Sequence, residues 1–230
     1  MSLTNFGISA SGKIGSVAGG IAGTNLIAEA FAGTAPMTTA AFTTVTGRLY
    51  VMWVSGVESG TPAAITSVSS HSMTWTLQAQ AGSGANDCRI WCYYGIEAGA
   101  GGSDTMVVTN SATWDFGGRV LIDEFTGIDT AAPVVQSAVA TSAAATTLTA
   151  TLAAFGSANN ATAGGFMHSV GSAGNGTVGS GFTELGDLSS ATTYPHSLYS
   201  EYKSSNDTSV DASWSASQTC ACIGIEIKAA

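Results

Sequence analysis

Four cysteines are the residues whose types and spacing could do chemistry as a group. They form one C-x3-C pair and one C-x-C pair: Cys88, Cys92, Cys220 and Cys222. Structural zinc sites favour C-x2-C pairs, and neither pair has that spacing. If Cys88 and Cys92 lie on one strand, their Cα atoms are about 13 Å apart, too far for a disulfide between them. Buried free thiols are the favoured interpretation. A cross-strand disulfide between the two pairs and a metal site stay open as alternatives.

Two carboxylates could catalyse glycoside hydrolysis if they lay about 5–9.5 Å apart. Asp123 and Glu124 are adjacent in the sequence, so on a strand they would point to opposite faces and could not act together. The other set that a fold could bring together consists of Glu97, Asp115 and Glu124.

Three histidines, His71, His168 and His196, could each act as a general base beside a serine nucleophile. The G-x-S-x-G motif that presents such a serine in many hydrolases does not occur in the chain. We therefore expect each histidine at the surface or in a turn. The sequence predicts a protein that is not an enzyme, with no catalytic residue, no cofactor and no metal.

Trp114 is the aromatic residue that the sequence singles out for binding. Most of the other tryptophans lie inside apolar runs typical of strands, whereas Trp114 lies in a turn-rich segment, 110–118. An exposed aromatic ring can stack on a sugar or pack against another protein. We expect Trp114 to be exposed and to contact a glycan or a neighbouring subunit.

Short apolar and aromatic runs between glycine-rich turns are the elements that would position these residues, and they predict an all-β fold. Strands are expected near 49–54, 73–79, 88–94, 104–110, 118–125, 165–170, 181–185, 197–203, 207–213 and 219–227. Residues 25–31 fit either a strand or a short helix. Many short strands separated by turns are typical of sandwiches and barrels. The expected fold is a two-sheet, jelly-roll-like β-sandwich.

The second part of the chain resembles the first. Residues 104–125 align with 207–228 without a gap, which places Val120 with Ile223 and Ile122 with Ile225. Earlier matching blocks occur in the same order in both parts. We predict one sandwich domain over 25–230, built from two similar halves at about 38–129 and 130–228, neither of which need fold alone.

Alternation along the last strand of each half assigns its faces. Ile223 and Ile225 share one face, and the same phase points Val120 and Ile122 toward the core. Leu121 and Phe125 then lie on the outer face. Exposed apolar patches tend to mark contact surfaces, so these two residues are candidates for binding a partner. The alternative is that the N-terminal segment covers them.

Charge is scarce along the whole chain. Charged residues make up 9% of it, and six Lys and Arg against 15 Asp and Glu give a net charge of −9. So few cations exclude direct binding to nucleic acid. From 130 to 183 there is no Asp, Glu, Lys or Arg at all. This composition suits a surface that is packed into a larger assembly or exposed outside cells.

The N-terminal residues 1–24 have the composition of a flexible arm. Glycine and serine alternate there with spaced apolar residues: Phe6, Ile8, Ile14, Val17 and Ile21. No cleaved signal peptide and no membrane insertion are expected. Such an arm gains order by docking on another surface, which we expect to be a capsid shell or a sister subunit. The alternative is docking on its own sandwich.

Five segments together resemble a known family. They are 49–54, 73–77, 90–95, 104–109 and 121–129, the last containing Glu124-Phe125-Thr126-Gly127-Ile128-Asp129. The chain resembles, over about 36–228, a loose family of jelly-roll-like sandwiches found in structural modules of tailed bacteriophages and in bacterial surface proteins. It departs from the family pattern at Ser72-Met73, where a glycine before the tryptophan is usual. The resemblance implies a virion accessory protein and transfers no active site.

We therefore expect a non-enzymatic virion structural protein, specifically a capsid decoration protein. Its partners would be the major capsid protein or other virion subunits, and it would form homo-oligomers. It would be assembled in the host cytoplasm and lie on the virion surface. The alternative is a glycan-binding adhesin or fibre domain of a phage tail or a bacterial surface protein, in an extracellular location.

Overall fold

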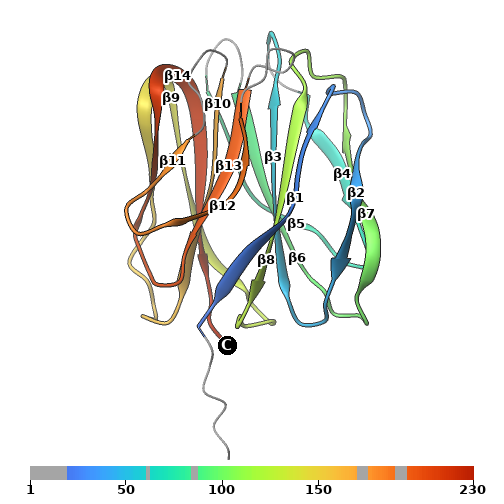
Figure 1. Cartoon of the computed structure of the whole chain (residues 1–230), viewed down its shortest axis with the longest axis vertical. Coiled ribbons are helices and arrows are strands. Elements are labelled where there is room, and N and C mark those ends of the chain that lie inside the picture. Colours follow the sequence, from blue (N-terminus) through green and yellow to red (C-terminus); the bar gives the residue numbers. More distant parts are fainter. Residues whose placement is uncertain (1–19, 61–62, 84–87, 170–175, 190–195) are drawn as a thin grey trace, which may run out of the picture.

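The computed structural model describes residues 20–60, 63–83, 88–169, 176–189 and 196–230. Within them the chain forms fourteen strands arranged in three antiparallel sheets. The prediction of an all-β sandwich is confirmed. The three sheets form three layers in Figure 1, and the five-stranded sheet lies between the other two.

The central sheet has five strands in the order β1-β8-β3-β6-β5. Their bounds are β1 Ala22–Phe31, β8 Gly118–Thr126, β3 Leu49–Val57, β6 Cys88–Ile96 and β5 Thr76–Ser83. All nine residues of β3 are buried, because the sheet is covered on both faces. A strand of this kind is a continuous apolar run rather than an alternating one.

A three-stranded sheet covers one face of the central sheet. Its order is β2-β7-β4, with bounds β2 Met37–Thr44, β7 Gly102–Asn110 and β4 Ile65–Ser69. Met52, Val54, Val120 and Ile122 of the central sheet pack in the apolar cluster between these two sheets. Val120 and Ile122 are therefore buried, as predicted from the alternation.

A six-stranded sheet covers the other face. Its strands are β9 Val134–Thr151, β10 Ala161–Ser169, β11 Thr177–Val178, β12 Thr183–Leu188, β13 His196–Lys203 and β14 Ser209–Ile227. Their order is β11-β14-β10-β13-β12, with β9 paired to β14. The segments predicted at 207–213 and 219–227 belong to one long strand, β14.

The paired strands β9 and β14 bend back over their own sheet. The side chain of Gln136, near the start of β9, exchanges two hydrogen bonds with the backbone of Ala153, just after its end. The paired strands arch at one end of the molecule in Figure 1. A third apolar cluster lies inside this bend. It contains Phe166 of β10, Tyr199 of β13 and Val210 from the first part of β14.

The faces of the central and six-stranded sheets meet in a further apolar cluster. Trp53 from the central sheet and Ile225 from the six-stranded sheet are both completely buried in it. Gly165 lies beneath Trp53, and a Cβ atom on this glycine would come within 2.2 Å of the indole ring. Ile223 and Ile225 are buried as predicted.

The same cluster overturns the prediction that Leu121 and Phe125 lie on an exposed outer face. Both have an exposed fraction of 0% and lie between the two sheets. The ring of Phe125 packs edge-on against Tyr202, with 5.7 Å between centroids. Alternation predicts an exposed face only for a strand with one buried face, whereas both faces of β8 are buried.

The order of strands repeats between the two parts of the chain. The series β8-β3-β6-β5 has its counterpart in β14-β10-β13-β12, and β2-β7-β4 has its counterpart in β9-β14-β11. The gapless residue alignment, however, is out of phase in the last strand. Ile122 faces the three-stranded sheet, while Ile225 faces the central sheet.

The N-terminal arm is described only from residue 20 onward. Phe6, Ile8, Ile14 and Val17 lie outside the described residues. Ile21 is only 2% exposed and belongs to the cluster between the central and six-stranded sheets. Its carbonyl accepts a hydrogen bond from the hydroxyl of Tyr202, and residues 22–24 already belong to β1. This end of the arm therefore docks on its own chain.

Candidate functional site

Trp114 is a core residue rather than an exposed one, which corrects the sequence prediction. Its side chain has an exposed fraction of 0%. The indole N–H donates a hydrogen bond to the carbonyl of Ala63 at 2.9 Å, and the ring stacks on Trp91 at 5.3 Å. A Cβ atom on Gly56 or Gly118 would lie within 3 Å of this ring, so the two glycines form the slot that holds it. Trp114 cannot stack on a sugar without leaving the core.

None of the four cysteines forms a disulfide, and all four are buried. Burial raises the pKa of Cys220 to about 11 and that of Cys222 to about 12, and it also raises the pKa of Cys92. Thiols in this state are poor nucleophiles and poor metal ligands, because both roles need the thiolate. In the described part of the chain, no group of three or more His, Cys, Asp or Glu residues could hold a metal ion.

Asp123 and Glu124 point to opposite faces of β8, as expected, and each is bound in its own network. Asp123 is 1% exposed and accepts hydrogen bonds at 2.8 Å from the Asn25 amide and the Trp53 indole. Burial raises the pKa of Asp123 to about 6. On the other face, the Glu124 carboxylate pairs with Arg48 at 2.5 Å and accepts from the Tyr50 hydroxyl. Both carboxylates are occupied by neighbouring side chains.

Glu97, Asp115 and Glu124 do not form one site. Glu97 accepts hydrogen bonds from the Thr44 hydroxyl and the Gly99 amide. Asp115 instead accepts from the backbone and hydroxyl of Ser59. The partners of Glu97 and Glu124 lie around the turn between β2 and β3, and those of Asp115 just after the other end of β3.

Two of the three histidines are in the interior, which corrects the expectation that all three lie in turns or at the surface. His168 and His196 have exposed fractions of 0%. His168 stacks on Trp214 with 5.2 Å between ring centroids. Burial lowers the pKa of His168 to about 4 and that of His196 to about 3, so both rings are neutral at pH 7. His71 lies in a turn with a φ of 50°, and its ring contacts the backbone carbonyls of Phe42 and Gly102.

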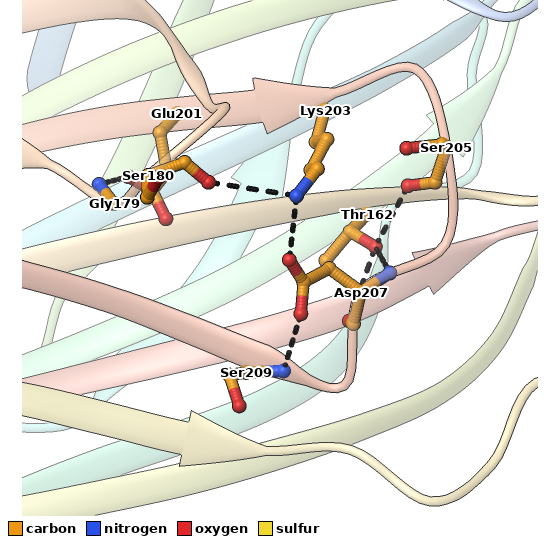
Figure 2. A network of polar contacts seen from close by, with 8 residues as sticks. All are labelled: Thr162, Gly179, Ser180, Glu201, Lys203, Ser205, Asp207 and Ser209. Carbon is orange, nitrogen blue, oxygen red and sulfur yellow. Dashed lines mark hydrogen bonds and ion pairs between the residues drawn. The ribbon is translucent and has the colours of Figure 1, made fainter.

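The turn between β13 and β14 is held by a network of polar contacts that includes an ion pair, as Figure 2 shows. Lys203 pairs with Asp207 at 2.7 Å, and Asp207 accepts a hydrogen bond from the Ser209 amide. The hydroxyl of Thr162 donates to backbone carbonyls of the turn and accepts from the Asp207 amide. These contacts fix the turn against β10.

Glu201 lies beside this turn, and its pKa is shifted further from the ordinary value than that of any other described carboxyl group. Its exposed fraction is 0%, and one carboxyl oxygen accepts from the Gly179 amide at 2.9 Å. The other oxygen has no hydrogen-bond partner among the residues that the structure describes. Burial raises the pKa of Glu201 to about 8, so the group is largely protonated at pH 7. A carboxyl group sealed in the interior has no access to a substrate.

A cavity of about 550 Å³ opens near the C-terminus. Its polar side contains Asn160 and Glu226, and its apolar side contains Val134 and Val135. Glu226 accepts hydrogen bonds at 2.5 Å from both Gln136 and Asn160. Each carboxylate oxygen of Glu226 therefore already accepts a hydrogen bond from one side-chain amide. These two hydrogen bonds connect β9 and the loop before β10 to β14.

Strand β9 contributes an exposed and uncharged surface. Half of its 18 residues are exposed, and none is charged. Val135 and Val139 each have an exposed fraction of 51%. Among the described residues, the large apolar side chains that are exposed are Val45, Leu77, Phe116, Val135 and Val139, and none of them is Trp or Tyr.

Comparison with protein-family models, with curated proteins and with solved structures finds no match to this chain. No helix in the described ranges has the length and apolar character needed to cross a membrane.

Proposed function

We propose that this chain is a non-enzymatic structural protein of a bacteriophage virion, specifically a capsid decoration protein that binds the shell or sister subunits. The observation that carries the proposal is the charge-free surface of β9, which lies within the run from 130 to 183 that has no Asp, Glu, Lys or Arg. Surfaces of freely soluble domains are normally rich in mixed charges. A surface without charge suits a protein that is packed against other subunits.

The interior supports the same proposal. Asp123, Glu124 and Glu226 are held by hydrogen bonds or ion pairs to neighbouring side chains, and Glu201, His168 and His196 are sealed from solvent. These groups stabilise or occupy the core and leave no described pair of an activated nucleophile and a base. The family resemblance of the strand segments agrees with this role.

The glycan-binding alternative loses the residue on which it was based. A sugar platform needs an exposed aromatic ring, and Trp114 is packed between Gly56, Gly118 and Trp91. We therefore propose no glycan role for Trp114. The apolar contact role predicted for Leu121 and Phe125 is likewise not proposed, because both lie between sheets.

Co-sedimentation with phage shells that lack this protein tests the proposal. The full chain should bind the shells in a saturable way. A variant that lacks residues 1–19 should have the same melting temperature as the full chain and should bind the shells more weakly. Removal of residues 1–24 is the control for folding, because it also removes Ile21 from the core and should lower the melting temperature. A full chain that stays in the supernatant at every concentration would contradict the proposal.

A further inference from the structure

Strand β9 is an edge strand along its whole length. Its residues 136–142 pair in regular register with residues 220–226 of β14, and its residues 147–151 pair with the first part of β14. Within the described ranges, β9 pairs with no other strand. The backbone groups on its second side are therefore available as a template for another strand.

The other edge strands of the described sheets carry features that block such pairing. In β2, the backbone N–H of Ala40 is already taken by the carboxylate of Glu29. β12 has a bulge and carries Glu184 and Asp187. β1 and β5 each have a register irregularity, and β4 and β11 have only five and two residues.

The segment 136–142 of β9 lacks these protections. It reads Gln-Ser-Ala-Val-Ala-Thr-Ser, with no charge, no proline and no bulge inside it; the register irregularities of β9 lie on either side, between residues 134 and 136 and between residues 142 and 147. Val139 has an exposed fraction of 51%, and Thr141 is exposed. The Gln78 amide of β5 reaches Ser137, so the more open part of the segment is centred on Val139 and Thr141.

The uncharged segment 136–142 is compatible with a second copy of this chain as the occupant. The net charge of −9 makes two copies repel each other over most approaches. An approach through β9 brings uncharged Ala, Ser, Thr and Val residues together. Two identical edges that meet antiparallel around a two-fold axis form a closed interface, because the same segment is used on both sides.

We propose that the 136–142 segment of β9 pairs antiparallel with the same segment of a second copy of this chain. The backbone hydrogen bonds of the pair would join the two six-stranded sheets into one continuous sheet. The biological meaning of this dimer rests on the assembly role proposed above. Its existence is measured on the purified chain alone, so failure of the dimer and failure of the virion role are separate results.

Paired lysine substitutions test the interface. In V139K/T141K, lysines of the two copies would lie near each other across the new strand pair, where like charges are destabilising. The control is T43K/V45K on and just after β2, which replaces the same residue types at exposed positions of the opposite sheet and adds the same charge. Sedimentation velocity should show a wild-type dimer, a control dimer of similar affinity, and a dissociation constant at least tenfold higher for V139K/T141K. Circular dichroism should show that both variants stay folded.

Cysteine substitution supplies a second readout that does not depend on weakening the dimer. The native thiols are buried, so an intermolecular disulfide would report the introduced residue. Under mild oxidation, Val139→Cys or Thr141→Cys should form covalent dimers, and Thr43→Cys should not. A wild-type chain that stays monomeric up to its solubility limit would overturn the proposal. Equal dimer affinity in the two lysine variants, or crosslinking only at position 43, would overturn it as well.

Discussion

Replacement of Trp114 separates a core role from a binding role. The side chain is fully buried, stacks on Trp91 and donates to the Ala63 carbonyl. Truncation of a buried Trp to Ala costs about 3–5 kcal/mol. That range already includes the lost contacts of the ring, and the lost hydrogen bond, about 1 kcal/mol, and the lost ring stacking, about 0.5–1.5 kcal/mol, place this variant at its upper end. We expect Trp114→Ala to lower the free energy of unfolding by about 5 kcal/mol, a large part of the 5–15 kcal/mol typical of a domain.

Two further variants make this measurement decisive. Trp114→Phe keeps an aromatic ring in the slot but loses the N–H donor, and should cost less than the alanine variant, about 1–3 kcal/mol. Phe116→Ala is the control, because this neighbouring ring is 36% exposed and its loss should cost less than about 1 kcal/mol. The assay is guanidinium unfolding followed by tryptophan fluorescence and circular dichroism. If Trp114→Ala costs as little as Phe116→Ala, with an unchanged denaturant slope, the assignment of Trp114 to the core is wrong.

Three more predictions follow from the interior. Ile225→Ala empties a fully buried position between two sheets and should cost about 2–5 kcal/mol in chemical denaturation; a cost below about 1 kcal/mol would contradict the assigned face of β14. The folded pKa of Asp123, about 6, lies above its ordinary value of 3.8, so its contribution to stability is present below about pH 4 and is lost as the pH rises through 6. The free energy of unfolding of the wild type should therefore fall by about 2 kcal/mol relative to that of Asp123→Asn between pH 4 and pH 7, and parallel pH profiles of the two proteins would refute this. The four buried thiols should react with a thiol reagent only after unfolding, so fast labelling of the native protein would show that the cysteines are accessible.

The strands that could be predicted from sequence are those whose apolar residues are contiguous and bounded by glycine. The run that became β3 is an example, and its lack of alternation was a usable signal that both of its faces are buried. The same signal is present in β8, where Val120, Leu121 and Ile122 are consecutive. Alternation predicts that Leu121 and Phe125 are exposed, but the continuous apolar run is the more informative signal, and both residues are buried.

Other elements could not be predicted because long-range pairing determines them. Strand β9 is rich in alanine, which has a low strand propensity, and its conformation is set by pairing with β14. Trp114 lies in a segment that looks like a turn, and only the approach of Gly56 and Gly118 creates the slot that buries it. The burial of His168 and His196 depends likewise on the stacking of sheets, which no local spacing in the sequence reports.

Quantitative mass spectrometry of purified virions, from the phage whose particles would contain this chain, tests the central claim most directly. A decoration protein covers the shell, so the chain should be present in a fixed ratio to the major capsid protein and at many copies per particle. The ratio should stay constant through a gradient purification that removes soluble proteins. Absence of the chain from intact particles, while it is abundant in the lysate, would contradict the proposed function.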